Sequence, residues 1–179
     1  MRRVIKVYRN RRYQWLDGSP VPSGTLDMLE IGRHNAGLVS AIRNESLAEV
    51  FRRFLDEDRH GVFAMIDGVP AGHAWITAPV AYSRVVNSYA RLATRECLIH
   101  YCFVDPSHRG KGVYAAMLHE LTSWALRSRA SRVLVDTDVQ NTASQRGILR
   151  AGFAKDQETL DIVIARRLLW SRHWPTTDD

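Results

Sequence analysis

The segment Val104-Asp105-Pro106-Ser107-His108-Arg109-Gly110-Lys111-Gly112-Val113-Tyr114 decides the predicted fold of this chain. An apolar run from Leu98 to Val104 leads into it, and apolar residues at helical spacing follow from Val113 to Leu126. This order predicts a strand, a short basic turn and the start of a helix. The first N–H groups of a helix have no intrahelical partner, and the helix dipole adds positive potential there. We therefore expect the turn to bind an anion such as a pyrophosphate.

Four residues of the turn favour anion binding. Gly110 and Gly112 carry no side chain that would hold an anion away from the backbone, and Arg109 and Lys111 add positive charge. The turn is not a P-loop, because the glycine spacing and the Lys-Ser/Thr ending of that motif are missing. It is not a dinucleotide-binding fingerprint either, since that motif requires three glycines.

At these residues the chain resembles the GNAT superfamily of acyl-CoA-dependent N-acetyltransferases. That superfamily carries an Arg/Gln-x-x-Gly-x-Gly/Ala turn, and Arg109, Gly112 and Tyr114 occupy its three defining positions. Tyr114 departs from the small residue that is usual at the last of them. Downstream, Asn141-Thr142-Ala143-Ser144 and Ala151-Gly152-Phe153 resemble the next landmark, an Asn ahead of a helix that closes in Gly-Phe. The resemblance covers roughly residues 61–170.

The resemblance implies a function and a set of binding residues. It implies acetyl-CoA as the co-substrate, with direct transfer of the acetyl group to a primary amine in a ternary complex. The turn would hold the pyrophosphate, and the backbone of the strand before it would pair with the pantetheine arm like an added strand. The residues expected to bind acetyl-CoA are Cys102, Phe103, Val104, Arg109, Gly110, Lys111, Gly112, Val113, Tyr114, Asn141 and Ser144.

The composition is that of a globular protein, which we expect to form one domain over residues 1–179. Hydrophobic residues make up 45% of the chain and charged residues 25%, which are ordinary globular values. No run approaches the length of a membrane span, and no apolar stretch follows the basic N-terminus as it does in a signal peptide. Cys97 and Cys102 lie in one expected strand, on opposite faces and unable to bridge each other. We expect a cytoplasmic protein without membrane attachment, as a monomer or homodimer.

Basic residues crowd the N-terminus, and the net charge of the chain is +6. The residues in question are Arg2, Arg3, Lys6, Arg9, Arg11 and Arg12. One interpretation is an arm for nucleic acid. We favour a strand with solvated charges, because no nucleic-acid-binding module follows. The apolar residues of that strand, expected to contact the core, are Val4, Ile5, Val7 and Tyr8.

Helix and strand signals alternate along the chain, and no internal repeat or linker divides it. Together with the resemblance, this predicts an α/β fold with a GNAT-like mixed, mostly antiparallel central sheet flanked by helices on both faces. Residues 79–95 carry no firm pattern and form either a substrate loop or an irregular connection. The other expected elements are a strand at 2–9, a loop at 17–24, a helix begun by a capping box at Ser46–Glu49, a hairpin at 61–76 turning at Asp67-Gly68, strands at 132–139 and 159–170, and a helix from a capping box at Thr142–Gln145 to Gly152.

Acetyl transfer to an amine requires a group that removes a proton from it, because an alkyl amine is mostly protonated at neutral pH. In similar enzymes a carboxylate or histidine on the strand before the turn often acts as this base. His100 is the first candidate, since the ordinary histidine pKa of about 6.5 suits the task. Glu96 is the second. Each residue also has a structural interpretation. His100 would then be a histidine packed against its neighbours, and Glu96 a charged residue at the start of the strand. Alternation predicts one shared face for Glu96, Leu98, His100, Cys102 and Val104.

The departing thiolate of CoA also requires a proton. The superfamily frequently uses a Tyr seven residues after the landmark Asn, but Ile148 occupies that position here. Ser144 is the main candidate for the donor of this proton. The alternative is that Ser144 is only a polar residue in the first turn of the helix. Tyr114 is a further candidate for the proton donor. Its place at the start of the helix alternatively indicates that it lines the CoA channel. We interpret Cys102 as a small buried residue rather than as a nucleophile.

The acceptor is expected to be a small-molecule amine, such as an amino sugar, amino acid, polyamine or aminoglycoside-like compound. His73 and Trp75 share a face of the predicted hairpin and would line its pocket, unless His73 is an exposed or capping residue. The Asn-x-x-Ser landmark also resembles ribosomal-protein acetylating branches, so a protein N-terminal or lysine acetyltransferase is one alternative. A non-catalytic acyl-CoA-binding module, suggested by the missing Tyr, is another. Metal-ligand spacing is missing among the histidines, so we expect no metal site.

Overall fold

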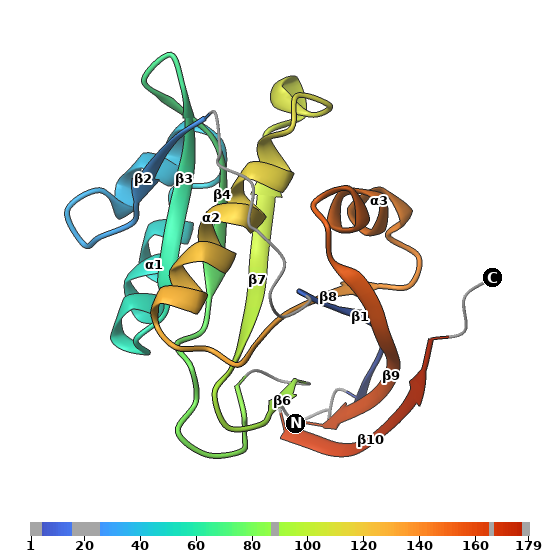
Figure 1. Cartoon of the computed structure of the whole chain (residues 1–179). Helices are drawn as coiled ribbons and strands as arrows, with labels where there is room; N and C mark the ends of the chain where they lie inside the picture. The colour runs from blue at the N-terminus through green and yellow to red at the C-terminus, as the bar shows by residue number, and fades with distance from the viewer. Residues whose placement is uncertain (1–4, 16–25, 87–89, 165–166, 177–179) are drawn as a thin grey trace.

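The computed structural model describes residues 5–15, 26–86, 90–164 and 167–176. Its main strands are β1 (Ile5–Gln14), β2 (Asp27–Glu30), β3 (His60–Ile66), β4 (Val69–Ile76), β7 (Glu96–Val104), β8 (Arg132–Asp138), β9 (Ala154–Ile164) and β10 (Arg167–Pro175). They form one sheet in the order β10-β9-β1-β8-β7-β4-β3-β2 (Figure 1). Among the described residues, the strands of this sheet pair antiparallel except for β7 and β8, which are parallel. This architecture confirms the predicted mixed, mostly antiparallel sheet.

Helices cover both faces of the sheet, as predicted. α2 (Val113–Arg127) and α3 (Thr142–Arg150) contribute to the hydrophobic core on one face. α1 (Leu47–Asp56) and the short helix η1 (Ala36–Ala41) contribute to a second core on the other face. Figure 1 shows α2 crossing in front of the sheet and α1 behind it. The apolar residues at helical spacing in α2 face the core as predicted, since Met117 and Leu121 are both 0% exposed.

The hairpin of β3 and β4 forms where the sequence places it. Asp67 and Gly68 connect the two strands with φ angles of 51° and 76°. Two successive positive φ angles match the right-handed twist of the flanking strands, which is why Asp-Gly favours this turn. A register shift between Ala64 and Met65 lies opposite the region of Pro70.

Both helix starts differ in detail from the predicted capping boxes. Ser46 precedes α1 without a side-chain capping bond, and Glu49 pairs with Arg52 instead. At α3 the capping residue is Asn141, whose Oδ1 accepts a hydrogen bond from the backbone N–H of Ser144 at 3.1 Å. α3 ends as predicted, with Gly152 at a φ of 91° just beyond it.

The two ends of the chain meet in the sheet. The expected last strand at 159–170 is in fact parts of two antiparallel strands, β9 and β10, and the N-terminal strand β1 lies between β8 and β9. Ile5 and Val7 are each 62% exposed, so the expectation that they contact the core is wrong. The reason is that β1 pairs with β8 only from Asn10 onward, which leaves Ile5 and Val7 beside β9 alone. Val4 and the loop expected at 17–24 lie outside the described residues.

Residues 79–95 contain two short paired strands, β5 (Arg84–Val85) and β6 (Arg91–Leu92). Val80 and Leu92 are buried, with exposures of 2% and 0%, and pack in a small core with Leu98 and Leu134. This segment is therefore anchored to the start of β7. Among the described residues, no helix has the length and apolar character needed to span a membrane.

Candidate active site

β7 and β8 separate halfway along β7, which opens the sheet. Their pairing runs from Glu96 with Arg132 to Ile99 with Val135, and in the described part of the chain no later residue of β7 pairs with β8. The next residues of β8 continue to pair with β1 on their other side. The edge of β7 from residue 100 to 104 is thus open on this side to an extended chain that supplies backbone-like donors and acceptors.

A bulge at Tyr101 changes the direction of the side chains in this part of β7. Tyr101 has a φ of 53°, in the left-handed region that is uncommon for a non-glycine residue. Across the strand pair, His73 is opposite Phe103 while Trp75 is opposite His100. Two steps along β4 therefore correspond to three steps along β7, which is the definition of a β-bulge.

The bulge overturns the predicted shared face of the strand. Cys102 and Val104 pack against the core beneath α2, whereas the His100 ring lies 5.2 Å from the ring of Phe54 in α1. His100 and Cys102 are therefore on opposite faces, because the extra residue reverses the alternation. For the same reason Cys97 and Cys102 contact the same core instead of facing opposite sides, and both are free thiols.

The turn after β7 adopts a shape that suits anion binding. Asp105 accepts a hydrogen bond from the backbone N–H of Ser107 at 2.9 Å, which fixes its first residues. Gly110 and Gly112 have φ angles of 78° and 79°, and Gly112 immediately precedes α2. No atom outside the neighbouring residues lies within 4 Å of where a Cβ would stand on either glycine, so both face open space.

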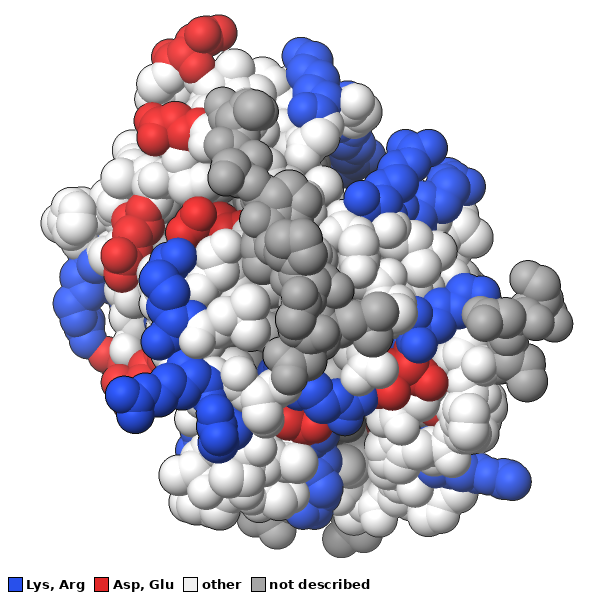
Figure 2. All heavy atoms as spheres, viewed as in Figure 1, with Lys and Arg blue, Asp and Glu red and all other residues white. Residues whose placement is uncertain are grey.

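A pocket of about 350 Å³ lies between this turn, the first turn of α2 and α3. Of the predicted binding residues, its lining contains Val104, Arg109, Gly110, Gly112, Val113 and Tyr114. From α3 the sequence predicted only Ser144 and missed the four residues that line the pocket, Ala143, Arg146, Gly147 and Arg150. The four-residue spacing of the two arginines was the available signal, because it puts both on one helix face. In Figure 2, Lys and Arg side chains gather at the upper right, over this turn and α3.

Tyr114 links the three elements around the opening. Its hydroxyl lies 3.2 Å from Oγ of Ser144 in α3, and Tyr114 and Cys102 of β7 pack against the same hydrophobic core, where the phenol interacts with the thiol. Burial raises the pKa of Tyr114 above its ordinary value and raises the pKa of Cys102 to about 12. At neutral pH the phenol and the thiol are therefore both protonated, which disfavours Cys102 as a nucleophile.

The remaining predicted binding residues are not part of the pocket lining. Asn141 caps α3, and Ser144 contacts the pocket residue Tyr114. Lys111 is exposed on the turn. Phe103 is turned to the other face of the sheet, where the guanidinium carbon of Arg43 lies 4.4 Å from the centre of its ring.

Residues 29–153 match the Acetyltransferase (GNAT) family. This chain belongs to the GNAT family. No curated protein matches it, but solved structures share its fold. A GNAT-family protein from Novosphingobium aromaticivorans aligns with a TM-score of 0.63 at 16% identity, over 98% of this chain and 68% of the other.

Two further similar structures are of acetyltransferases whose names state the substrate. The aminoglycoside N-acetyltransferase AAC(6')-Iy, in complex with CoA, aligns with a TM-score of 0.58 at 23% identity, over 72% of this chain and 91% of the other. A ribosomal-protein-alanine N-acetyltransferase from Brucella melitensis biovar Abortus 2308 has a TM-score of 0.52 at 14% identity, over 68% and 86%. At these identities the similarity establishes the fold and not the substrate.

In this GNAT protein His100 is held by an arginine. Nη1 of Arg59 lies 2.9 Å from Nε2 of His100, and since a guanidinium only donates, the imidazole accepts. Burial, with the nearby positive charge of Arg59, lowers the pKa of His100 to about 3. The imidazole is therefore neutral but weakly basic, and its expected titration near neutral pH is not supported. Its catalytic role stays a prediction.

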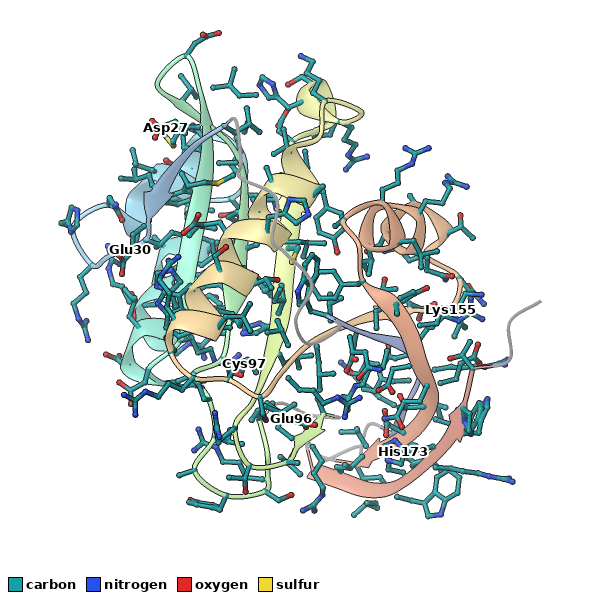
Figure 3. The ribbon with its side chains drawn as sticks, viewed as in Figure 1. Asp27, Glu30, Glu96, Cys97, Lys155 and His173 are labelled. Atoms are coloured by element: carbon teal, nitrogen blue, oxygen red, sulfur yellow. The ribbon has the colours of Figure 1, made fainter. Side chains whose placement is uncertain are left out.

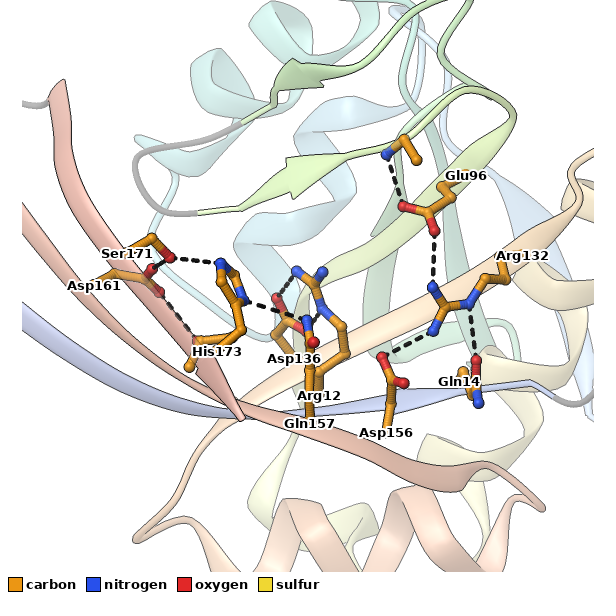
Figure 4. Close-up of polar contacts among 12 residues, drawn as sticks. Arg12, Gln14, Glu96, Arg132, Asp136, Asp156, Gln157, Asp161, Ser171 and His173 are labelled. Atoms are coloured by element: carbon orange, nitrogen blue, oxygen red, sulfur yellow. Dashed lines mark hydrogen bonds and ion pairs between the residues drawn. The ribbon is translucent and has the colours of Figure 1, made fainter. Parts of the chain in front are cut away.

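Glu96 lies at the opposite end of β7 from the pocket (Figure 3). Eight residues separate it from Val104, or about 26 Å in an extended strand. Its carboxylate accepts hydrogen bonds from Arg132 at 3.0 Å and from the backbone N–H of Ala93 at 2.8 Å. Arg132 also binds Gln14 and Asp156, so the group ties β1, β7, β8 and β9 together (Figure 4). These contacts give Glu96 a structural role in the sheet.

His73 and Trp75 share a face of β4, as predicted, and both rings contact Phe51 of α1 at about 5 Å. Their exposures are only 1% and 0%, so they are core residues beneath α1. The expectation that they line an acceptor pocket fails because α1 covers them. Burial also lowers the pKa of His73 to about 4. Among the described residues, no cluster of His, Cys, Asp and Glu has the arrangement of a metal site.

Proposed function

We propose that this GNAT protein transfers the acetyl group of acetyl-CoA to a primary amine of a small molecule, directly and within a ternary complex. The observation that carries the proposal is the pocket between the turn, α2 and α3, because it adjoins the open edge of β7. An anion site and an open strand edge side by side match the two chemically different parts of CoA, its phosphates and its amide-containing pantetheine arm.

The residues present fit acetyl-CoA. The pyrophosphate would face the backbone N–H groups around Gly110 and Gly112, where no side chain intervenes. Arg109, Arg146 and Arg150 would supply positive charge to its phosphates. The bound thioester supplies the activated acetyl group. The strand edge ending at Val104 would orient that group through backbone hydrogen bonds, as an added strand is held in a sheet.

The amine would reach the acetyl group at the opening between β7 and β8. Because burial, together with the nearby charge of Arg59, lowers the pKa of His100 to about 3, loss of the amine proton to solvent is the simpler route. His100 as a base, possible only with a changed environment, remains the competing prediction. Positioning of the two substrates would then supply much of the rate enhancement.

A small-molecule acceptor is supported by the similarity to the aminoglycoside acetyltransferase, which covers 91% of that protein. The alternative of a protein acceptor has a parallel in the ribosomal-protein-alanine acetyltransferase, at a lower TM-score. We also propose a single domain and, from the two free cysteines, a reducing cytoplasmic location.

The test is release of CoA, followed with a thiol reagent, over a panel of amino sugars, amino acids, polyamines, aminoglycosides and N-terminal peptides. Acetylated products are identified by mass spectrometry, and reactions without amine measure simple hydrolysis. Amine-dependent release supports the enzyme, and the best acceptor class decides between small molecule and protein. Tight CoA binding without transfer to any amine would instead favour a non-catalytic binding module.

A further inference from the structure

A chain of polar side chains that includes the pocket residue Tyr114 connects α3, α2 and β7. The Tyr114 hydroxyl lies 3.2 Å from Ser144 Oγ, and the phenol interacts with the Cys102 thiol. The Sγ atom of Cys102 lies 3.6 Å from the backbone carbonyl oxygen of His100 and donates a hydrogen bond to it. The chain therefore runs from α3 through α2 to β7.

One consistent arrangement of the hydrogens directs the phenol toward the sulfur of Cys102. The Cys102 thiol hydrogen is used on the carbonyl of His100, so the sulfur is left to accept. In this arrangement the single hydroxyl hydrogen of Tyr114 points toward that sulfur and its oxygen accepts from Ser144, a pair in which either hydroxyl can donate. In this arrangement the phenol is a hydrogen-bond donor directed at a sulfur atom beside the open strand edge.

We propose that Tyr114 donates the proton that the CoA thiolate takes up when it leaves, with Ser144 as the residue that positions and reprotonates the phenol. This inference rests on the proposed acetyl transfer. Tyr114 lines the pocket and reaches Cys102, at the edge where the pantetheine arm would lie. A CoA sulfur there would be an acceptor of the same kind as Sγ of Cys102.

The step balances in protons and electrons. The amine nitrogen bonds to the carbonyl carbon, the carbon–sulfur bond breaks, and its electron pair stays on sulfur. The phenolic proton moves to that sulfur and gives the free thiol. The phenolate regains a proton from solvent through the hydroxyl of Ser144, while the nitrogen loses one proton to solvent as the amide forms. Burial, which raises the pKa of Tyr114, ensures that the donor is protonated at neutral pH.

Two neighbours show that the phenol has a place built for it. Gly147 leaves room for the ring, because a Cβ there would come 2.6 Å from Cδ1 of Tyr114. Ile148 is 0% exposed and packs in the core, so α3 offers no competing hydroxyl at that position. The hydroxyl that reaches the opening therefore comes from α2.

The first experiment is Tyr114→Phe, which keeps the ring on Gly147 and removes only the hydroxyl. Using the best amine found for the wild type, we expect turnover to fall about 10²-fold or more, as for loss of a general acid. The affinity for acetyl-CoA should change little. Ser144→Ala should lower turnover less. Tyr82→Phe, at a tyrosine that is 66% exposed, is the matched control and should keep full turnover.

Two readouts are independent of catalysis. By calorimetry, the wild type should bind CoA more tightly than desulfo-CoA, and Tyr114→Phe should lose this difference. The thiol pKa of bound CoA, from thiolate absorbance, should be lower in the wild type than in the variant, since a hydrogen bond to the charged form favours it.

The outcomes separate the two proposals. Wild-type transfer to an amine establishes acetyl transfer, whatever the variant does. If Tyr114→Phe then keeps wild-type turnover, or if the thiol pKa and the preference over desulfo-CoA are the same in both proteins, Tyr114 is not the donor. If the wild type acetylates no amine, the proposed function fails, and the binding readouts alone still report whether the phenol contacts the sulfur.

Discussion

The Tyr114 ring fills the space that a side chain on Gly147 would need. A Cβ placed on Gly147 would come 2.6 Å from Cδ1 of Tyr114, closer than Cβ atoms approach in folded proteins, and 3.1 Å from Cε1. A large residue at the start of α2 is thus matched by a missing side chain in α3. This pair explains how the chain accommodates Tyr114 where the GNAT turn usually has a small residue.

Gly147→Ala should therefore destabilise the protein, although Ala normally stabilises a helix interior by about 1 kcal/mol relative to Gly. Overpacking typically costs about 1–3 kcal/mol, so we expect a lower free energy of unfolding in urea. In a Tyr114→Ala background the same change should become stabilising. Gly37→Ala is the control, because nothing lies within 4 Å of its added Cβ. Equal effects of Gly147→Ala in both backgrounds would contradict the contact.

Gly112→Asp should weaken acetyl-CoA binding by at least ten-fold, or about 1.4 kcal/mol, because it puts a carboxylate beside the expected pyrophosphate. Gly112→Asn is the matched control, since Asn and Asp both tolerate the positive φ of 79° and differ in charge. Calorimetry on both folded variants checks the result. If the Gly112→Asp variant binds acetyl-CoA as tightly as the Gly112→Asn variant, the pyrophosphate does not lie at this turn.

Arg146→Glu and Arg150→Glu should each weaken acetyl-CoA binding on the order of ten-fold at low salt, since both line the pocket. The loss should shrink at high salt, because exposed charges are screened. It should also be smaller for dephospho-CoA if these residues face the 3′-phosphate. Arg172→Glu, at an exposed residue of β10, changes the charge equally and serves as control. A similar loss in that control would show a general charge effect.

The stability of the protein should fall as the pH is lowered from about 6.5. Burial lowers the pKa of His100 to about 3 and that of His73 to about 4, so the unfolded chain binds protons first. Stability is then complete above the ordinary histidine pKa and is lost toward the folded-state values, by up to about 1.4 kcal/mol per pH unit for each group. Urea unfolding at several pH values measures this. The double variant His73→Phe, His100→Gln should show a flatter profile, whereas His34→Gln, at an exposed histidine, should match the wild type.

His100→Gln also tests the base directly. Glutamine keeps an acceptor for Arg59 but cannot take up a proton at neutral pH. With a histidine pKa of about 3, we expect turnover within a few-fold of the wild type and the same rise of rate with pH, set by the amine. A loss of 10²-fold or more, together with a missing step in the profile, would restore His100 as the general base.

Local sequence determined the features that depend only on neighbouring residues. Gly110 and Gly112 adopt the positive φ angles of the predicted turn, and Asp67-Gly68 closes the predicted hairpin. α2 buries the stripe that its spacing predicts. Such elements follow from backbone sterics and hydrophobic period, which the sequence displays directly.

Tertiary structure alone decided how these elements meet. The bulge at Tyr101 arises from the pairing of β7 with β4, so strict alternation placed His100 on the wrong face. Burial in the folded protein lowers the pKa of His100, and Arg59, 41 residues away in the chain, adds to this effect. The contact of Tyr114 with Ser144 joins two helices across 30 residues. Strand register, burial and pKa depend on residues brought together by folding, and a single sequence carries no local pattern for such pairs.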